Sequence, residues 1–143
     1  MADLDSLDAI FKAYDVRGTV PDQLDAGLSG RIGAAFARYV ADADGAERVL
    51  VARDMRPSGV ELAAAFAEGV QRQGLDVVDL GLASTDLAYF ASGTLRAPAA
   101  MFTASHNPAG YNGIKLCLTG AGPVGEESGL GEIKRMARSG VAT

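Results

Sequence analysis

Short apolar runs alternate with amphipathic helical segments along most of the chain, and this alternation constrains the fold more than any other feature. The runs at residues 48–52, 76–80 and 99–103 have the length and composition of buried strands. The order strand, helix, strand, helix, strand predicts a mainly parallel sheet. Because right-handed crossovers place the connecting helices on the two faces of such a sheet, both faces should be covered.

Four helices are predicted from apolar spacing and from start signals. They cover residues 24–41, 58–74, 84–93 and 127–138. Asp22 is the expected N-cap of the first helix, and Ser84 is that of the third. Ser58 and Glu61 have the spacing of a capping box at the start of the second helix.

A fourth strand is predicted at residues 113–118, which follow the third strand too closely for a crossover helix. This strand should therefore run antiparallel to the third. The prediction is an α/β protein of three layers, α/β/α, with a mixed four-stranded sheet whose last strand is antiparallel. The chain has 143 residues and no evident linker, so residues 1–143 are expected to form a single domain.

Charge and composition exclude several classes of function. The net charge is -5 and the 13 Lys and Arg residues are scattered, so nucleic acid is not an expected partner. The first 11 residues hold three aspartates and no basic region, and no apolar run approaches about 20 residues, which predicts a cytoplasmic protein without a membrane span. Cys117 is the only cysteine and is expected to be an inert buried thiol.

The segment 103–112, Thr-Ala-Ser-His-Asn-Pro-Ala-Gly-Tyr-Asn, places the only histidine, His106, beside Ser105. The dipeptides Asn107-Pro108 and Ala109-Gly110 favour turns, so this segment should be an exposed loop. It leaves the carboxyl end of a strand, which is the edge of an α/β sheet where ligands bind. One interpretation is that the loop is a reactive site; the other is that it is only a turn.

Phosphoryl transfer suits this loop better than acyl transfer. A serine nucleophile in acyl transfer needs a separate base, and neither a second histidine nor a Gly-x-Ser-x-Gly motif is present. Phosphoryl transfer needs a hydroxyl or phosphoserine and nearby cations, which Lys115, Arg17 and Arg53 could supply. No Gly-x-Gly-x-x-Gly motif follows a predicted strand, which argues against a dinucleotide-binding domain.

Three segments, at residues 11–18, 53–58 and 103–115, match the blocks of a known enzyme family in order and spacing. The third matches at Thr103-Ala104-Ser105-His106-Asn107-Pro108, Gly110, Asn112, Gly113 and Lys115. It closely resembles the phosphoserine loop of the α-D-phosphohexomutases, which are the phosphomannomutases and phosphoglucomutases. The resemblance covers nearly the whole chain and implies the first of the four domains of such an enzyme.

The resemblance also implies roles for individual residues. The implied catalytic residues are Ser105, Lys115, His106 and Arg17, and the implied substrate-binding residues are Tyr14 and Asn107. Ser105 would hold a phosphoryl group and pass it to a sugar hydroxyl, and Lys115 would act as general acid or base. Mg²⁺ is the implied cofactor, with the phosphoryl group on Ser105 as one ligand.

The implied reaction interconverts hexose 1-phosphate and hexose 6-phosphate through a bisphosphate, with hexose 1,6-bisphosphate as activator. The magnesium loop, the sugar-selecting loop and the phosphate clamp of the family belong to three further C-terminal domains. We therefore expect this chain to be an almost inactive fragment whose partners are phosphorylated hexoses and those domains. The alternative is a non-catalytic anion-binding or protein-interaction module on the same fold.

Structural interpretations compete with these roles at several positions. Arg53, Asp54 and Arg56 could fix the loop after the first sheet strand through an ion pair. Tyr14 could be a core aromatic residue, and Lys115 could only shield a sheet edge. Residues 42–45 are interpreted as a solvated turn rather than a metal site, and residues 125–129 as a helix start rather than a sugar-selecting loop.

Overall fold

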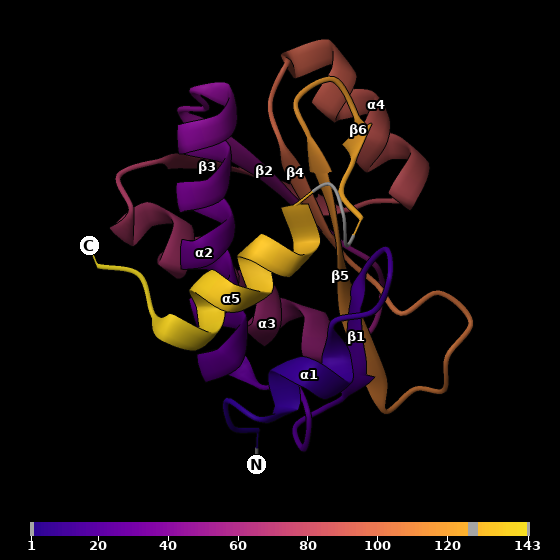
Figure 1. The fold of residues 1–143 in the computed structure, drawn as a ribbon. Helices are drawn as coiled ribbons and strands as arrows, with labels where there is room; N and C mark the ends of the chain where they lie inside the picture. The colour runs from indigo at the N-terminus through magenta and orange to yellow at the C-terminus, as the bar shows by residue number, and fades with distance from the viewer. Residues whose placement is uncertain (1, 126–128, 143) are drawn as a thin grey trace.

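The computed structural model describes residues 2–125 and 129–142 of the chain. A six-stranded sheet lies between two layers of helices (Figure 1). The strands are β1 (Val16–Thr19), β2 (Arg48–Arg53), β3 (Asp76–Leu82), β4 (Ala99–Phe102), β5 (Tyr111–Leu118) and β6 (Gly122–Pro123). The helices are α1 (Ser6–Ile10), α2 (Ala26–Asp44), α3 (Ser58–Arg72), α4 (Thr85–Leu95) and α5 (Gly131–Ser139).

The sheet has the order β1-β5-β4-β2-β3, and β6 pairs with the end of β5. Strand β2 is parallel to β3 and β4, while β5 is antiparallel to β4, as predicted. The predicted count of four strands is wrong, because β1 and β6 also join β5. Strand β1 has the sequence Val-Arg-Gly-Thr, too short and too polar to form a recognisable apolar run.

The main core lies between the sheet and a layer formed by α1, α2, α3 and α5. Phe36, Phe66 and Phe102 are fully buried, and the ring of Phe66 lies 6.2 Å from that of Phe36 and 5.4 Å from that of Phe102. Helices α2 and α3 approach so closely that a Cβ atom on Gly69 would lie 2.1 Å from the carbonyl oxygen of Gly30. This core holds β4 and β2 rigidly, so the loops at their carboxyl ends start from fixed positions.

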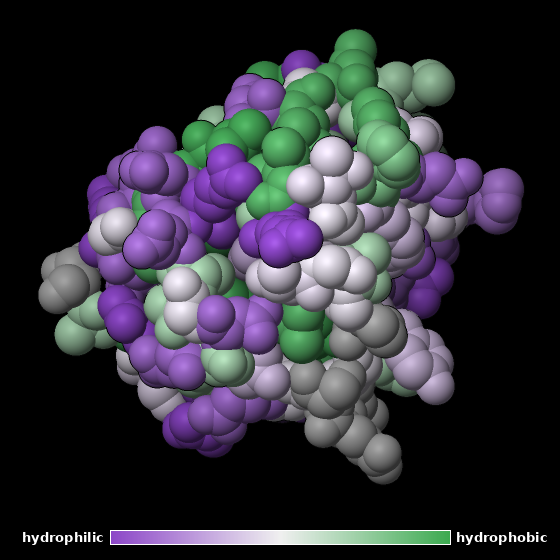
Figure 2. Space-filling model, turned by 90° about the horizontal axis from the view of Figure 1, so that it is seen from above, coloured by the Kyte–Doolittle hydropathy of each residue, from purple (hydrophilic) through white to green (hydrophobic). Residues whose placement is uncertain are grey.

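Helix α4 covers the opposite face of the sheet, which confirms the three-layer prediction (Figure 1). Its core is small, and Cys117 is buried within it. Burial raises the pKa of the Cys117 thiol, as expected of an inert cysteine. Leu87 and Phe90 on α4 remain exposed, and Figure 2 shows hydrophobic residues gathered on one side of the face seen there.

The start of α2 differs from the prediction, and that of α4 agrees with it. Asp25, and not Asp22, is the N-cap of α2, with its carboxylate accepting a hydrogen bond from the Leu28 N–H. The helix starts later because Thr19 accepts hydrogen bonds from the N–H groups of residues 23 and 24, so the chain turns there first. Ser84 caps α4 as predicted.

The capping box predicted at Ser58 and Glu61 is wrong. Helix α3 has Pro57 at its N-cap position and no side-chain cap. The Ser58 hydroxyl instead accepts a hydrogen bond from Asn112 Nδ2 at 2.9 Å. A residue expected to begin a helix therefore also ties that helix to β5.

Helix α5 begins at Gly131, later than the predicted 127, and ends at Ser139. Residues 126–128, on which the helix-start interpretation of residues 125–129 partly depends, lie outside the described residues. Arg31 of α2 anchors the end of α5 by donating to the carbonyl oxygens of Ala137 and Arg138. Within residues 2–125 and 129–142, no helix has the length and apolar character needed to cross a bilayer.

Candidate functional site

The loop from residue 103 to residue 110 joins β4 to β5 at the carboxyl end of β4. Ser105 and His106 are exposed, as predicted for this segment. Ser105 has a φ of 52°, which is uncommon for a residue with a side chain. Its N–H donates to Thr103 Oγ1 at 3.0 Å, which stabilises the bend. Ser105 therefore lies on a defined turn rather than on an unconstrained loop.

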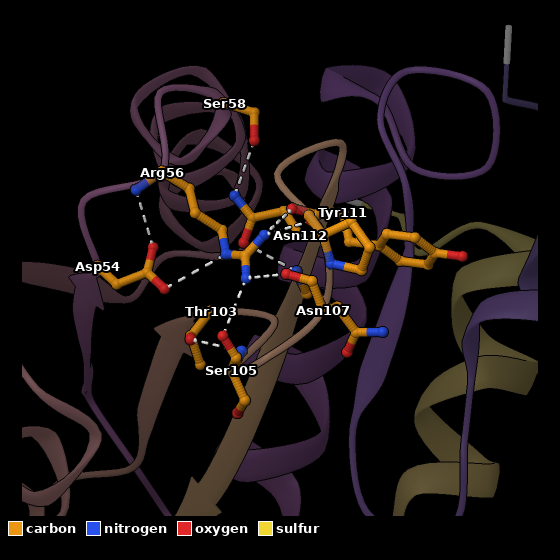
Figure 3. Close-up of polar contacts among 10 residues, drawn as sticks. Asp54, Arg56, Ser58, Thr103, Ser105, Asn107, Tyr111 and Asn112 are labelled. Carbon is orange, nitrogen blue, oxygen red and sulfur yellow. Dashed lines mark hydrogen bonds and ion pairs between the residues drawn. The ribbon is translucent and has the colours of Figure 1, made fainter.

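One arginine on another loop holds this turn (Figure 3). Arg56 Nη1 donates to the carbonyl oxygens of Pro108 and Tyr111 at 2.8 and 2.9 Å. Its Nη2 donates to the carbonyl oxygens of Ser105 and Asn107 at 3.0 and 2.7 Å. The guanidinium thus bonds to three backbone positions of this loop and to the first residue of β5.

Asp54 orients that arginine. One carboxylate oxygen of Asp54 accepts the backbone N–H of Arg56 at 3.0 Å, and the other lies 3.6 Å from Arg56 Nε. The Asp54 N–H in turn donates to the carbonyl oxygen of Phe102 at 3.0 Å. Asp54 and Arg56 therefore fix the loop after β2 by an ion pair, as the structural interpretation of these residues predicted. Arg53 does not take part, because no hydrogen bond or ion pair joins its side chain to the rest of the described chain.

Three segments far apart in sequence meet on the other side of the serine loop. Arg17 of β1 donates to Asn107 Oδ1 at 3.2 Å. The Asp15 carboxylate lies 3.6 Å from Arg17 Nη2 and 3.9 Å from Lys115 Nζ. Lys115 lies on β5, next to β1 in the sheet. The structure therefore brings Arg17, Lys115 and the serine loop together through Asp15 and Asn107.

The charges around the loop favour an anion. Arg17, Lys115 and Arg56 carry three positive charges, while Asp15 and Asp54 carry two negative ones. The Lys115 and Arg17 side chains are 30% and 36% exposed, so part of each cation is open to a ligand. Asp15 is only 14% exposed, and its distances of 3.6 and 3.9 Å from the two cations leave both able to bond to a phosphate as well.

The remaining predicted residues lie at the surface. His106 is exposed, and no hydrogen bond of its side chain to the described residues is present. Tyr14 is 79% exposed, so the interpretation of Tyr14 as a core aromatic residue is wrong. Its ring lies beside Gly125, where a Cβ atom would be 3.3 Å away. Tyr14 is thus available to a ligand, but it does not contact the serine loop through any described hydrogen bond.

The residues present do not by themselves fit a magnesium ion. In the described part of the chain, no group of three or more His, Cys, Asp and Glu side chains is arranged to hold a metal. Asp15, the carboxylate beside the loop, is already paired with two cations. A phosphoryl group on Ser105 could supply one oxygen ligand, and the others would have to come from outside these residues.

A groove of about 460 Å³ lies elsewhere, between α2 and α3. Its lining includes Gly30, Arg31, Gly69 and Arg72, and none of the candidate residues. Arg31 already donates to carbonyl oxygens at the end of α5, and Arg72 pairs with Glu68. Because none of the candidate residues lines this groove, we assign no part of the function to it.

Sequence reasoning missed the part that Asp15 and Thr103 take in the site, and it missed the contacts of Arg56 with the serine loop. Asp15 was overlooked although it lies two positions before Arg17 in the matched first segment. Thr103 was seen only as part of the matched loop, although a threonine two residues before a bend is a recognised acceptor for a backbone N–H. The contacts of Arg56 with the serine loop had no sequence signal, because they join residues about 50 positions apart.

The fold and the site define a class: an α/β/α domain that presents an exposed serine on a braced loop beside cations, at the carboxyl edge of its sheet. Residues 8–140 match the family described as phosphoglucomutase/phosphomannomutase, alpha/beta/alpha domain I. The chain belongs to the phosphoglucomutase/phosphomannomutase family.

The individual relatives agree with this assignment. A phosphomannomutase of Salmonella typhimurium is 38% identical over 131 residues, which are 91% of this chain and 28% of that protein. A phosphomannomutase of Klebsiella pneumoniae is 38% identical over 128 residues, 89% of this chain and 79% of that protein. The crystal structure of a phosphoglucomutase/phosphomannomutase family protein from Burkholderia thailandensis superposes with a TM-score of 0.82 at 38% identity, covering 100% of this chain and 32% of that one. The chain thus spans less than a third of the Salmonella protein.

Proposed function

We propose that residues 1–143 form the phosphoserine-bearing first domain of a phosphohexomutase, an intramolecular phosphotransferase that interconverts hexose 1-phosphate and hexose 6-phosphate. One observation carries the proposal. Ser105 is exposed on a left-handed bend, and its loop is joined to Arg17 by Asn107 beside Lys115. An exposed hydroxyl with cations beside it is what transfer of a phosphoryl group requires.

The proposed reaction has two transfers. In the first, the bond between Ser105 Oγ and phosphorus breaks while a hydroxyl oxygen of the hexose phosphate bonds to the phosphorus. Lys115 would take the proton of that hydroxyl, and Arg17 would balance the charge of the phosphoryl oxygens. In the second, the bisphosphate gives its other phosphoryl group back to Ser105, and Lys115 returns a proton to the freed sugar oxygen.

His106, Tyr14 and Asn107 would take supporting roles. His106 adjoins Ser105 and is exposed, so it can contact a phosphoryl group there. Asn107 fixes the loop against Arg17. Tyr14 would contact the sugar phosphate from the first matched segment, in keeping with its 79% exposure.

Magnesium would complete the charge balance, because a phosphoserine beside a sugar phosphate brings two dianions together. We propose that the phosphoryl group on Ser105 is the contribution of this chain to that ion. The further ligands and the sugar-selecting contacts would come from C-terminal domains of the same enzyme. The match covers only 28% of the Salmonella relative, whose length therefore allows further domains. The chain alone should then accept phosphate but barely isomerise sugars.

The test measures both properties in one sample. The chain is incubated with hexose 1,6-bisphosphate and Mg²⁺, intact mass reports any bound phosphoryl group, and a coupled assay follows conversion of hexose 1-phosphate to 6-phosphate. We expect the mass of one phosphoryl group in the wild type, none in Ser105→Ala, and isomerisation near background in both. Full isomerase activity would contradict the proposal that this chain needs further domains to isomerise sugars.

Titration with hexose phosphates separates the proposal from the alternative of a non-catalytic anion-binding module. Binding without any phosphorylated species, at a Ser105 that no hexose bisphosphate modifies, would favour the module. A phosphorylated species that depends on Ser105 would favour the enzyme.

A further inference from the structure

All the hydrogen bonds that Arg56 donates to the described part of the serine loop end on backbone carbonyl oxygens. The four acceptors of its two terminal nitrogens are the carbonyl oxygens of Ser105, Asn107, Pro108 and Tyr111, all within 3.0 Å (Figure 3). These oxygens span seven residues of chain and converge on one planar group. A convergence of this kind fixes the path of the backbone and leaves the side chains of the loop free for other contacts.

The guanidinium is itself held in place. Its side chain is only 13% exposed, and Asp54 lies 3.6 Å from its Nε. Because Asp54 also accepts the backbone N–H of Arg56, the arginine and its counter-charge are fixed relative to β2 and the start of α3. Arg56 therefore connects a surface loop to the rigid core of the domain.

The other hydrogen bonds of the loop are fewer and more scattered than those of Arg56. The Ser105, Asn107 and Tyr111 N–H groups bond to acceptors within the loop. From outside it, the Val20 N–H donates to the Gly110 carbonyl oxygen and Arg17 donates to Asn107 Oδ1. Residues 105, 106 and 108–110 are exposed, so apolar packing holds little of this stretch. The left-handed backbone of Ser105 costs about 1 kcal/mol or more relative to an ordinary conformation, so it persists only where surrounding contacts enforce it.

From these contacts we propose that Arg56 is a positioning residue for Ser105. It does not touch the reacting atoms. By bonding the inner carbonyl oxygens of the loop, it holds Ser105 in its left-handed conformation and keeps the hydroxyl directed outward from the braced backbone. The role of Arg56 in ordering the loop stands by itself, whereas its effect on phosphoryl transfer rests on the proposed function.

Lysine should not replace Arg56. A guanidinium presents five N–H donors in a planar fork, and four acceptors at two of its nitrogens use that geometry. A lysine ammonium keeps the charge but has three donors at a single atom, so it cannot reach all four oxygens. If Arg56 acts through the geometry of its hydrogen bonds, Arg56→Lys should therefore lose the ordering of the loop although it keeps the positive charge.

Hydrogen exchange in Arg56→Lys and Arg56→Ala measures loop order directly. The reporters are the N–H groups of Ser105, Asn107 and Tyr111, each of which is hydrogen-bonded within the loop. We expect their exchange to rise by at least about tenfold in both variants, since charged hydrogen bonds to the loop are lost. Exchange in β2 and α4 should stay as in the wild type. Arg72→Lys, at an exposed arginine that pairs with Glu68, is the matched control and should change nothing.

Two further readouts distinguish positioning from general stability. Guanidinium ion at low millimolar concentration should restore part of the loop protection in Arg56→Ala and have no effect on Arg72→Lys. The rate of Ser105 phosphorylation by hexose 1,6-bisphosphate should fall by about tenfold or more in Arg56→Lys, with the melting temperature nearly unchanged.

The outcomes separate the two proposals. Unchanged exchange at the three reporters in both Arg56 variants would overturn the positioning role, and so would a rise spread evenly over the whole chain. If the loop loosens but even the wild type never becomes phosphorylated, the positioning role stands and the proposed function fails.

Discussion

Replacing Gly113 with alanine should push β1 away from β5 and with it Arg17. Gly113 pairs with Arg17 across these two strands. A Cβ atom at Gly113 would lie 2.2 Å from the carbonyl oxygen of Val16 and 3.0 Å from that of Thr103. Both neighbours are backbone, so no side-chain rotation relieves the clash. The edge strand β1 has β5 as its partner in the sheet order, so it is the element that must retreat.

The cost follows from the geometry. An ordinary contact needs about 1 Å more room than the 2.2 Å found here, which would lengthen ladder hydrogen bonds of about 2.9 Å beyond the hydrogen-bonding range. Overpacking of this kind destabilises by about 1–3 kcal/mol. For a chain of this size the melting temperature should fall by roughly 3–10 °C. Arg17 would also be displaced from Asn107. Phosphorylation of Ser105 should therefore slow even at temperatures where the variant is still fully folded.

Urea unfolding of Gly113→Ala beside Gly93→Ala checks this reasoning. Gly93 lies in α4 with nothing within 4 Å of its Cβ position, so alanine there should stabilise the helix by about 0.5–1 kcal/mol. The two substitutions are chemically identical and should have opposite signs. A Gly113→Ala chain that unfolds at the wild-type urea concentration or above would refute the claim that β1 packs against β5 as described.

Three other substitutions or probes test the packing. Phe66→Ala should lower the free energy of unfolding in urea by about 3–5 kcal/mol, because Phe66 is fully buried between two rings. Phe90 is 69% exposed, so Phe90→Ala should change it by less than about 0.5 kcal/mol, and equal effects of the two substitutions would contradict the core described. Asp25→Ala should cost about 1 kcal/mol through loss of the α2 cap, and no loss would mean that the cap is not formed. Burial raises the pKa of Cys117, so fewer thiolates form at a given alkaline pH in the folded chain; alkylation at pH 8 should be slow until urea unfolds the protein, and rapid native labelling would contradict the burial.

The parts of the fold that could be predicted are those whose signal is local. The apolar residues of β2 and β4 and the helical spacing of α2 identify these elements without reference to the rest of the chain. Strand β1 could not be found in this way. Its four residues include Arg17 and Gly18, and it is stable because β5 lies beside it, which is a tertiary contact.

The exact residues at which helices begin show the same limit. Asp22 and Asp25 are both plausible N-caps by residue type, and only the turn at residues 19–24 decides between them. Ser58 has the spacing of a capping box, but Asn112 from a distant strand takes its hydroxyl as an acceptor. Competition from a partner far along the chain has no sequence pattern.

The candidate site divides in the same manner. The exposure of Ser105 and His106 follows from turn residues in one segment, so it was predictable. That Asp15 links Arg17 to Lys115, and that Arg56 braces the loop, depends on which strands are neighbours in the sheet. Side chains that meet through sheet order cannot be paired by spacing along the chain.

Locating the phosphoryl group by peptide fragmentation after incubation with hexose 1,6-bisphosphate and Mg²⁺ tests the central claim most directly. We expect one phosphorylated residue, Ser105, and an unmodified chain in Ser105→Ala, while Ser58→Ala should still be phosphorylated at Ser105. Modification at any other residue, or persistent phosphorylation of Ser105→Ala, would contradict it.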